Sequence, residues 1–163
     1  MVLRDAVRAT AGLLCTGVLV RATRQDDCGG GCGEGEGETV SDPDLSSVFV
    51  RMVGCLSAHR FDATDEKTFQ DGVFAALRSF DLEVEAEVEL RKGDIIDFMV
   101  GGGIGLELKI KGSQNAVLRQ LMRYAESPRV VRLALFTTQS SHFDMPSTIR
   151  GKPLLVYLRG GLA

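Results

Sequence analysis

Hydrophobic and polar residues follow regular patterns only from about Leu45 onward. After Thr64 and Asp65, either of which can cap a helix, apolar residues recur at spacings of three and four up to about Phe80. That spacing predicts an amphipathic helix. The next segment, 83–90 (EVEAEVEL), alternates strictly between glutamate and an apolar residue, which predicts a strand with one exposed face. The apolar residues expected to face inward are Val84, Ala86, Val88 and Leu90.

Four more strands and one more helix are predicted after this point. The strands are expected at 94–100, 106–111, 130–138 and 153–158, and glycines at 101–103 and 105 mark the turn between the first two. Ser113 is a suitable N-cap for a helix that would end at about Ser127, before Pro128. The run 130–138 is too continuously apolar for an edge strand, so it is expected in the sheet interior. The order α-β-β-β-α-β-β predicts an α/β fold with a mixed central β-sheet flanked by helices.

The N-terminal part of the chain has a different composition. Residues 25–44 are rich in glycine and acids, with Val40 as their one large apolar residue. Such a segment buries too little apolar surface to offset the entropy cost of ordering, so it is expected to be a poorly ordered linker. We therefore expect residues 1–45 to be an extension and residues 46–163 to be one domain, with a native start at Met52 as an alternative.

The four cysteines are Cys15, Cys28, Cys32 and Cys55. The close pair, Cys28 and Cys32, is compatible with half of a metal site or with a strained disulfide. A structural zinc site needs four ligands, and Cys15, Cys55 or His59 would have to complete it. Because no second close pair of Cys or His residues exists, ordinary reduced thiols are favoured.

Charge is divided unevenly along the chain. The net charge is -3, but residues 1–90 carry 8 Lys/Arg against 17 Asp/Glu, whereas residues 91–163 carry 11 against 5. A polyanionic partner is therefore plausible for the second part, while the acidic part could simply aid solubility. No apolar run approaches the roughly 18 residues of a membrane span. The apolar stretch 10–20 is followed by Arg21 and Arg24 in place of a cleavage site, so a cytoplasmic or nucleoid-associated location is expected.

Two acids and a lysine occupy adjacent predicted strands. Alternation places Ile95, Asp97 and Met99 on one face of the strand 94–100, and Ile96, Phe98 and Val100 on the other. On the strand 106–111, Glu107, Lys109 and Lys111 share a face. If the two strands pair through the glycine turn, Asp97 can approach Glu107 and Lys109. An acid with Ile95 and Met99 as its neighbours on the same face suggests a function.

These residue types suit metal-assisted hydrolysis of a phosphate ester. Mg²⁺ binds carboxylate and carbonyl oxygens and keeps several waters, with Mn²⁺ as a substitute. Lys109 could orient the attacking water or stabilise negative charge. On the following helix, Gln120 and Tyr124 project together, and Arg119 and Arg123 form a second pair suited to phosphate contact. Lys111 adds a further cation for substrate binding.

At these residues the chain resembles the PD-(D/E)XK nuclease superfamily, which has the restriction-endonuclease-like fold. The superfamily pattern is an acid on one strand and E-x-K on the next, here Asp97, nine residues, then Glu107-Leu108-Lys109. Many recombination-type members also carry Q-x-x-x-Y on the next helix, as Gln120 and Tyr124 do here. One departure is that Ile96, instead of proline, precedes the acid. The resemblance covers roughly residues 62–138.

The resemblance implies a Mg²⁺-dependent nuclease of the kind used in DNA recombination, repair, phage or restriction processes. It implies metal ligation by Asp97, Glu107 and the backbone carbonyl of Leu108, with Lys109 at the attacking water. A glutamate on the first helix is often a further active-site member, and Glu66 fits best, with Gln70 as the fallback. The catalytic set implied is therefore Asp97, Glu107, Lys109, Gln120, Tyr124 and Glu66.

Two other functions are left open. One is a catalytically silent DNA-binding or assembly module of the same fold, and the other is a nuclease that acts on RNA. The intact set of Asp97, Glu107 and Lys109 favours DNA hydrolysis over the silent module. Cutting of both strands of a duplex would favour a homodimer. His142 follows a buried strand and could face the site, although a position on a surface loop is favoured.

Overall fold

The structure, a computed structural model, describes residues 42–158. The predictions for the apolar stretch 10–20, for most of the linker 25–44, and for the pair Cys28 and Cys32 lie outside the described residues. Within residues 42–158, no helix has both the length and the apolar content needed to cross a membrane.

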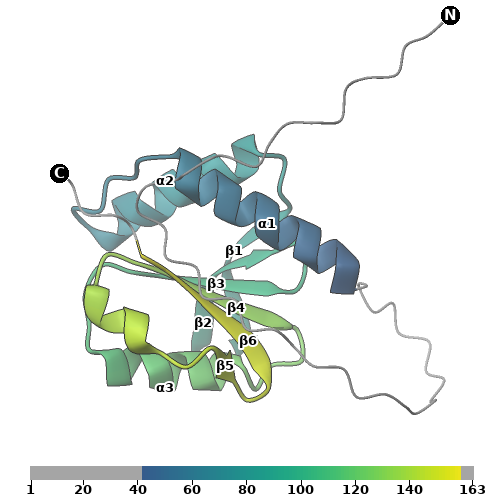
Figure 1. Cartoon of the computed structure of the whole chain (residues 1–163), viewed down its shortest axis with the longest axis vertical. Helices are drawn as coiled ribbons and strands as arrows, with labels where there is room; N and C mark the ends of the chain where they lie inside the picture. Colours follow the sequence, from purple (N-terminus) through teal and green to yellow (C-terminus); the bar gives the residue numbers. More distant parts are fainter. Residues whose placement is uncertain (1–41, 159–163) are drawn as a thin grey trace, which may run out of the picture.

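A mixed sheet of six strands forms the centre of the fold (Figure 1). The helices are α1 (Asp42–Ala58), α2 (Glu66–Ser79), α3 (Gln114–Tyr124) and the 3-10 helix η1 (Ser140–Asp144). The strands are β1 (Val84–Arg91), β2 (Asp94–Val100), β3 (Ile104–Lys109), β4 (Arg132–Thr137), β5 (Thr148–Ile149) and β6 (Lys152–Leu158). Their order across the sheet is β1-β2-β3-β4-β6-β5. The strands β3, β4 and β6 run parallel, and the remaining neighbours pair antiparallel.

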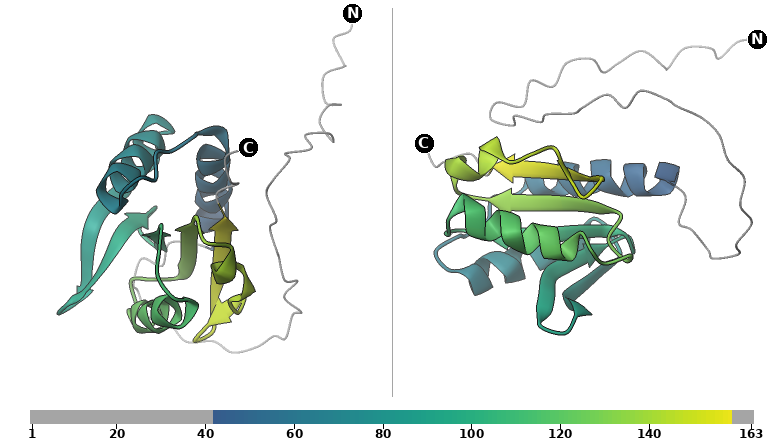
Figure 2. Two further views of the ribbon diagram at one scale, coloured as in Figure 1. Left: turned by 90° about the vertical axis from the view of Figure 1, so that its left-hand side faces the viewer. Right: turned by 90° about the horizontal axis from the view of Figure 1, so that it is seen from below.

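Helices cover both faces of the sheet. Figure 2 shows α1 and α2 on one face and α3 on the other. The core on the first face includes Phe69 of α2 and Phe136 of β4, and the core on the second includes Leu121 of α3 and Leu135 of β4. Because β4 is covered on both faces, its sequence is almost continuously apolar, as expected for an interior parallel strand.

The predicted helix starts are confirmed by their capping contacts. The Asp65 carboxylate accepts a 2.8 Å hydrogen bond from the Thr68 N–H at the start of α2. The Ser113 hydroxyl accepts one of 3.4 Å from the Ala116 N–H at the start of α3. Each cap satisfies a backbone donor that the first helical turn leaves without a partner. The predicted α/β class with a mixed, helix-flanked sheet is confirmed as well.

Helix α1 was not predicted, and neither were η1 and β5. Leu45 and Met52 are buried in the core on the α1 and α2 face, with exposed fractions of 1% and 0%. Because α1 begins at Asp42, helix α1 crosses the predicted boundary between residues 45 and 46. Pro43 suits the first turn of a helix, since its missing N–H has no helical partner there.

The predicted alternation of β1 and β2 is wrong at one point. Ala86 is exposed, and Ile96 belongs to the core on the α3 face, whereas Phe98 belongs to the core on the other face. Glu87 lies between the pairs Ala86–Phe98 and Val88–Ile96 and has φ of 51°. A residue in the left-handed region interrupts the two-residue period of β1, so Val84 before it and Val88 after it belong to cores on opposite faces.

Candidate active site

The candidate site lies where β2 and β3 stop pairing. The two strands pair antiparallel from Val100 opposite Ile104 to Phe98 opposite Leu106. Beyond that point β3 pairs only with β4, up to Lys109 opposite Thr137. At the end of the paired region, the Leu108 N–H donates a 2.7 Å hydrogen bond to the Asp97 carboxylate. This contact places Asp97 beside the Glu107-Leu108-Lys109 segment.

Asp97 is held by hydrogen bonds on both carboxylate oxygens. Besides the Leu108 N–H on Oδ2, the Gln70 side-chain amide donates to Oδ1 over 2.7 Å. Burial raises the pKa of Asp97, while the Leu108 hydrogen bond and the charge of Lys109 act in the opposite direction. Asp97 is therefore oriented from both α2 and β3.

Glu107 is the most buried acid of the site, with an exposed fraction of 1%. Its Oε1 forms an ion pair with Lys109 Nζ at 2.6 Å. Its Oε2 is buried without a hydrogen-bond partner among the described residues. Burial, followed by the charge of Asp97, raises the pKa of Glu107 to about 7. Buried polar atoms normally have a partner, so an unpartnered carboxylate oxygen next to a second acid is a place suited to a cation.

Lys109 is the cation of this cluster. Burial lowers the pKa of Lys109, but the charges of Glu107 and Asp97 outweigh burial, and the pKa is raised overall. Lys109 therefore stays protonated at neutral pH. In this arrangement its ammonium can donate hydrogen bonds and stabilise negative charge.

Gln120 and Tyr124 project together from α3, as the sequence predicts. Tyr124 belongs to the buried face of the helix and has an exposed fraction of 1%. Its hydroxyl donates to the Ile95 carbonyl, and the Gln120 side-chain amide donates to the Tyr124 oxygen. Burial and the charge of Glu107 raise the pKa of Tyr124, which keeps the phenol neutral. The pair thus reaches β2 two residues before Asp97.

Glu66 and Gln70 both lie on α2 but contact the site differently. Glu66 is exposed at the first position of the helix, and its charge raises the pKa of both Asp97 and Lys109. Gln70 touches Asp97 directly. The structure therefore brings both the favoured residue and its fallback to the same side of the site.

The three cations predicted to bind substrate have different surroundings. Lys111 and Arg119 are exposed. Arg123 donates from Nε to the Asp94 carboxylate over 2.7 Å, and Arg91 binds the other oxygen of Asp94. These two contacts, that of Arg123 first, lower the pKa of Asp94. Sequence reasoning missed this ion-pair cluster, although the three-residue spacing of Arg91 and Asp94 across a turn is a readable signal.

His142 is a structural residue, and its predicted position on a surface loop is wrong. It is fully buried; its Nε2 donates to the Gly112 carbonyl over 3.1 Å, and its Nδ1 accepts from the Thr137 hydroxyl over 2.8 Å. Gly112 follows β3 and precedes Ser113, the N-cap of α3. His142 therefore ties the end of β4 to the segment that joins the two parts of the site.

The donor set fits a magnesium ion with few protein ligands. Among residues 42–158, no three His, Cys, Asp or Glu side chains are grouped closely enough to hold a metal. A metal here would take two carboxylates, those of Asp97 and Glu107, with the Leu108 carbonyl as the predicted third ligand. Mg²⁺ commonly binds through one or two carboxylates and retains water in its other positions, so this set is compatible with it.

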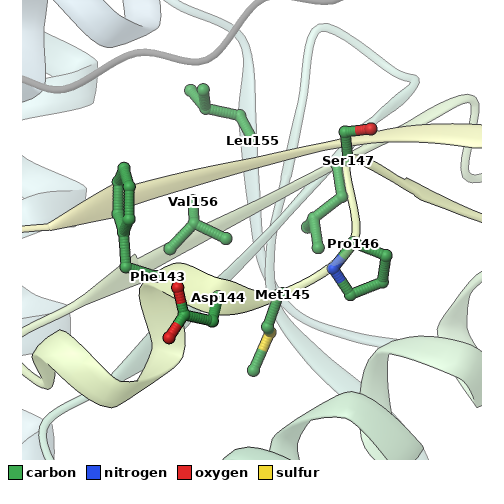
Figure 3. Close-up of a pocket in the computed structure, with 8 residues that line it drawn as sticks. Phe143, Asp144, Met145, Pro146, Ser147, Leu155 and Val156 are labelled. Atoms are coloured by element: carbon green, nitrogen blue, oxygen red, sulfur yellow. The ribbon is translucent and has the colours of Figure 1, made fainter.

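A separate hollow of about 330 Å³ lies against β6 (Figure 3). It is lined by Phe143, Asp144, Met145, Pro146, Ser147, Leu154, Leu155 and Val156. It shares no residue with the candidate site, and Asp144 is its one charged lining residue. This hollow is therefore distinct from the candidate site.

Comparison of the chain with protein-family models, with curated proteins and with solved structures found no match. The likeness to the PD-(D/E)XK superfamily therefore rests on the residues of this chain and stays a prediction.

Proposed function

We propose that the chain is a metal-dependent nuclease that hydrolyses phosphodiester bonds of DNA. The observation that carries the proposal is the cluster of Asp97, Glu107 and Lys109, in which Glu107 Oε2 is buried without a partner among residues 42–158. Burying Glu107 beside a second acid costs free energy, because the charge of Asp97 adds to burial in raising the pKa of Glu107. A fold that maintains such a cost at one place is typical of a functional site.

Asp97, Glu107 and the Leu108 carbonyl would hold Mg²⁺ or Mn²⁺. When bound, the ion lowers the pKa of a coordinated water and neutralises charge on the phosphate. Gln70 and the Leu108 N–H keep Asp97 in place by binding one carboxylate oxygen each. Such contacts to a ligating carboxylate fix its orientation and contribute to metal affinity.

Lys109 provides positive charge at the phosphate. Since Glu107 and Asp97 keep it protonated, its ammonium can orient the attacking water or stabilise the negative charge that develops on the phosphate oxygens. Lys111, Arg119 and Arg123 add exposed cations, as contact with a nucleic-acid backbone requires, and Arg123 is also paired with Asp94.

The direct test is a cleavage assay on plasmid, linear duplex, single-stranded and branched DNA, and on RNA of matched sequence, with Mg²⁺, Mn²⁺ or EDTA. We expect metal-dependent cleavage of DNA that falls about a thousandfold in Asp97→Asn and Lys109→Met. Lys67 and Asp71, an exposed pair on α2 with an Nζ–Oδ1 distance of 3.6 Å, offer matched controls. Lys67→Met and Asp71→Asn should cleave at the wild-type rate.

The other two functions give different results in the same assay. Selective cleavage of RNA would identify a ribonuclease with the same chemistry. Binding of DNA without cleavage under every condition would identify a catalytically silent module. Equal activity of the Asp97→Asn variant and its Asp71→Asn control would refute the proposed site.

A further inference from the structure

The pair Gln120 and Tyr124 contacts the backbone of β2 and not the surface of the site. Tyr124 is buried among the residues of α3 and the sheet, with an exposed fraction of 1%. Its hydroxyl has a single hydrogen to donate, and that hydrogen goes to the Ile95 carbonyl. Gln120 donates to the Tyr124 oxygen, which fixes the direction in which the hydroxyl points. The two side chains thus form one chain of hydrogen bonds that ends on β2.

Ile95 lacks the packing that fixes its neighbours. Its side chain is 52% exposed, whereas Ile96 and Phe98 are buried at 0% and 3%. The paired region of β2 and β3 stops at Phe98, so β3 does not hold the backbone at Ile95. On that side the Tyr124 hydroxyl restrains it, while on the other side Ile95 pairs with Glu89 of β1. Asp97 follows two residues later, at the point where β2 leaves β3.

We propose that Tyr124 and Gln120 are positioning residues, which hold the β2 backbone at Ile95 so that the Asp97 carboxylate is presented toward Glu107. This inference rests on the proposed function, in which Asp97 is a metal ligand. Tyr124 does not contact the nucleic acid, because its hydroxyl is buried and its donor is used within the fold. The residues matched by the Q-x-x-x-Y pattern therefore act through Asp97.

The test compares Tyr124→Phe with Tyr157→Phe, since the chain contains two tyrosines. Tyr157 is also buried, at 8% exposure, and its hydroxyl donates to Ser57 Oγ over 3.3 Å in the core on the opposite face. Both variants remove one buried hydroxyl and keep the ring. Three quantities are measured: Mn²⁺ affinity by calorimetry, DNA affinity in EDTA by fluorescence anisotropy, and amide hydrogen exchange over residues 95–97.

We expect Tyr124→Phe to weaken Mn²⁺ binding about tenfold or more, as is usual when a group that orients a metal ligand is lost. Exchange over residues 95–97 should quicken, kcat should fall by a similar factor, and KM and DNA affinity in EDTA should be unchanged. Tyr157→Phe should alter none of these. Gln120→Leu should change metal affinity in the same direction by a smaller factor. The double variant should bind Mn²⁺ no more weakly than Tyr124→Phe, because both side chains belong to the same chain of hydrogen bonds.

Two results would overturn the inference. In the first, Mn²⁺ affinity and exchange over residues 95–97 in Tyr124→Phe stay within twofold of Tyr157→Phe. In the second, DNA affinity in EDTA falls tenfold with metal affinity unchanged, which would make Tyr124 a substrate contact. Failure of the proposed function is a separate result, because it appears as absence of cleavage by the wild-type chain, whereas metal affinity and exchange report positioning without any reaction.

Discussion

Glu107 should make the metal-free protein less stable as pH rises. In the fold its pKa is about 7, against an ordinary value of 4.5. An acid whose pKa is raised by folding binds more protons in the folded state than in the unfolded chain between these two values. Stability is therefore lost as pH rises from about 4.5 to 7 and is constant above. Between pH 5 and pH 8 this group alone would remove about 2.5 kcal/mol from the free energy of unfolding.

The perturbation is Glu107→Gln, which keeps the shape of the side chain and removes its charge. Lys109 loses part of its counter-charge in this variant. The gain in the free energy of unfolding is therefore smaller than the full pH-dependent loss calculated for Glu107. We expect the variant to be more stable than wild type by about 1–2 kcal/mol at pH 8 and nearly equal to it at pH 5. Catalysis should be lost at the same time, since a metal ligand is replaced.

The assay is equilibrium urea unfolding followed by circular dichroism, in EDTA, at half-unit steps from pH 5 to pH 8. Glu83→Gln is the matched control, because Glu83 is exposed on the loop before β1. Its stability should follow the wild-type curve at each pH. If the Glu107→Gln curve and the wild-type curve fall in parallel across this range, Glu107 does not titrate near pH 7, and the physical reasoning about the buried acid pair is wrong.

Three further predictions follow from the packing and the site. Gly105→Ala should lower the free energy of unfolding by about 1–3 kcal/mol, because the added Cβ would lie 2.6 Å from Ile96 Cδ1. Ile96→Val removes that Cδ1 atom. When Gly105→Ala is combined with Ile96→Val, urea unfolding should therefore show a loss in the free energy of unfolding that is smaller than the sum of the two single losses. His142→Leu should cost about 2–4 kcal/mol in the same measurement, since the buried Thr137 hydroxyl and the Gly112 carbonyl both lose their partner. At pH 8, Mg²⁺ at a hundred times its dissociation constant should add about 2.7 kcal/mol to the stability of the wild type. The Mg²⁺ concentration needed for the same stabilisation should be higher at pH 6. Glu107 has a pKa of about 7, so at this pH its proton competes with the ion.

Local sequence signals predicted most elements because they depend on neighbours in the chain. The caps Asp65 and Ser113 and the spacing of Gln120 and Tyr124 are of this kind. Helix α1 shows the limit. Its apolar residues, from Leu45 to Leu56, have helical spacing, but they follow a segment of unusual composition, and the helix start at Asp42 lies within that segment.

The sequence by itself determined the class of the fold and the residue types that gather at the site. It placed Asp97, Glu107 and Lys109 on adjacent strands, because two-residue alternation and a glycine turn are local properties. Only the tertiary structure decided what each of them contacts. The hydrogen bonds from Tyr124 to the Ile95 carbonyl and from Gln70 to Asp97 join residues that are far apart in the chain. Burial within the fold leaves Glu107 Oε2 without a partner among the described residues and raises the pKa of this carboxyl group, and no local pattern carries that information.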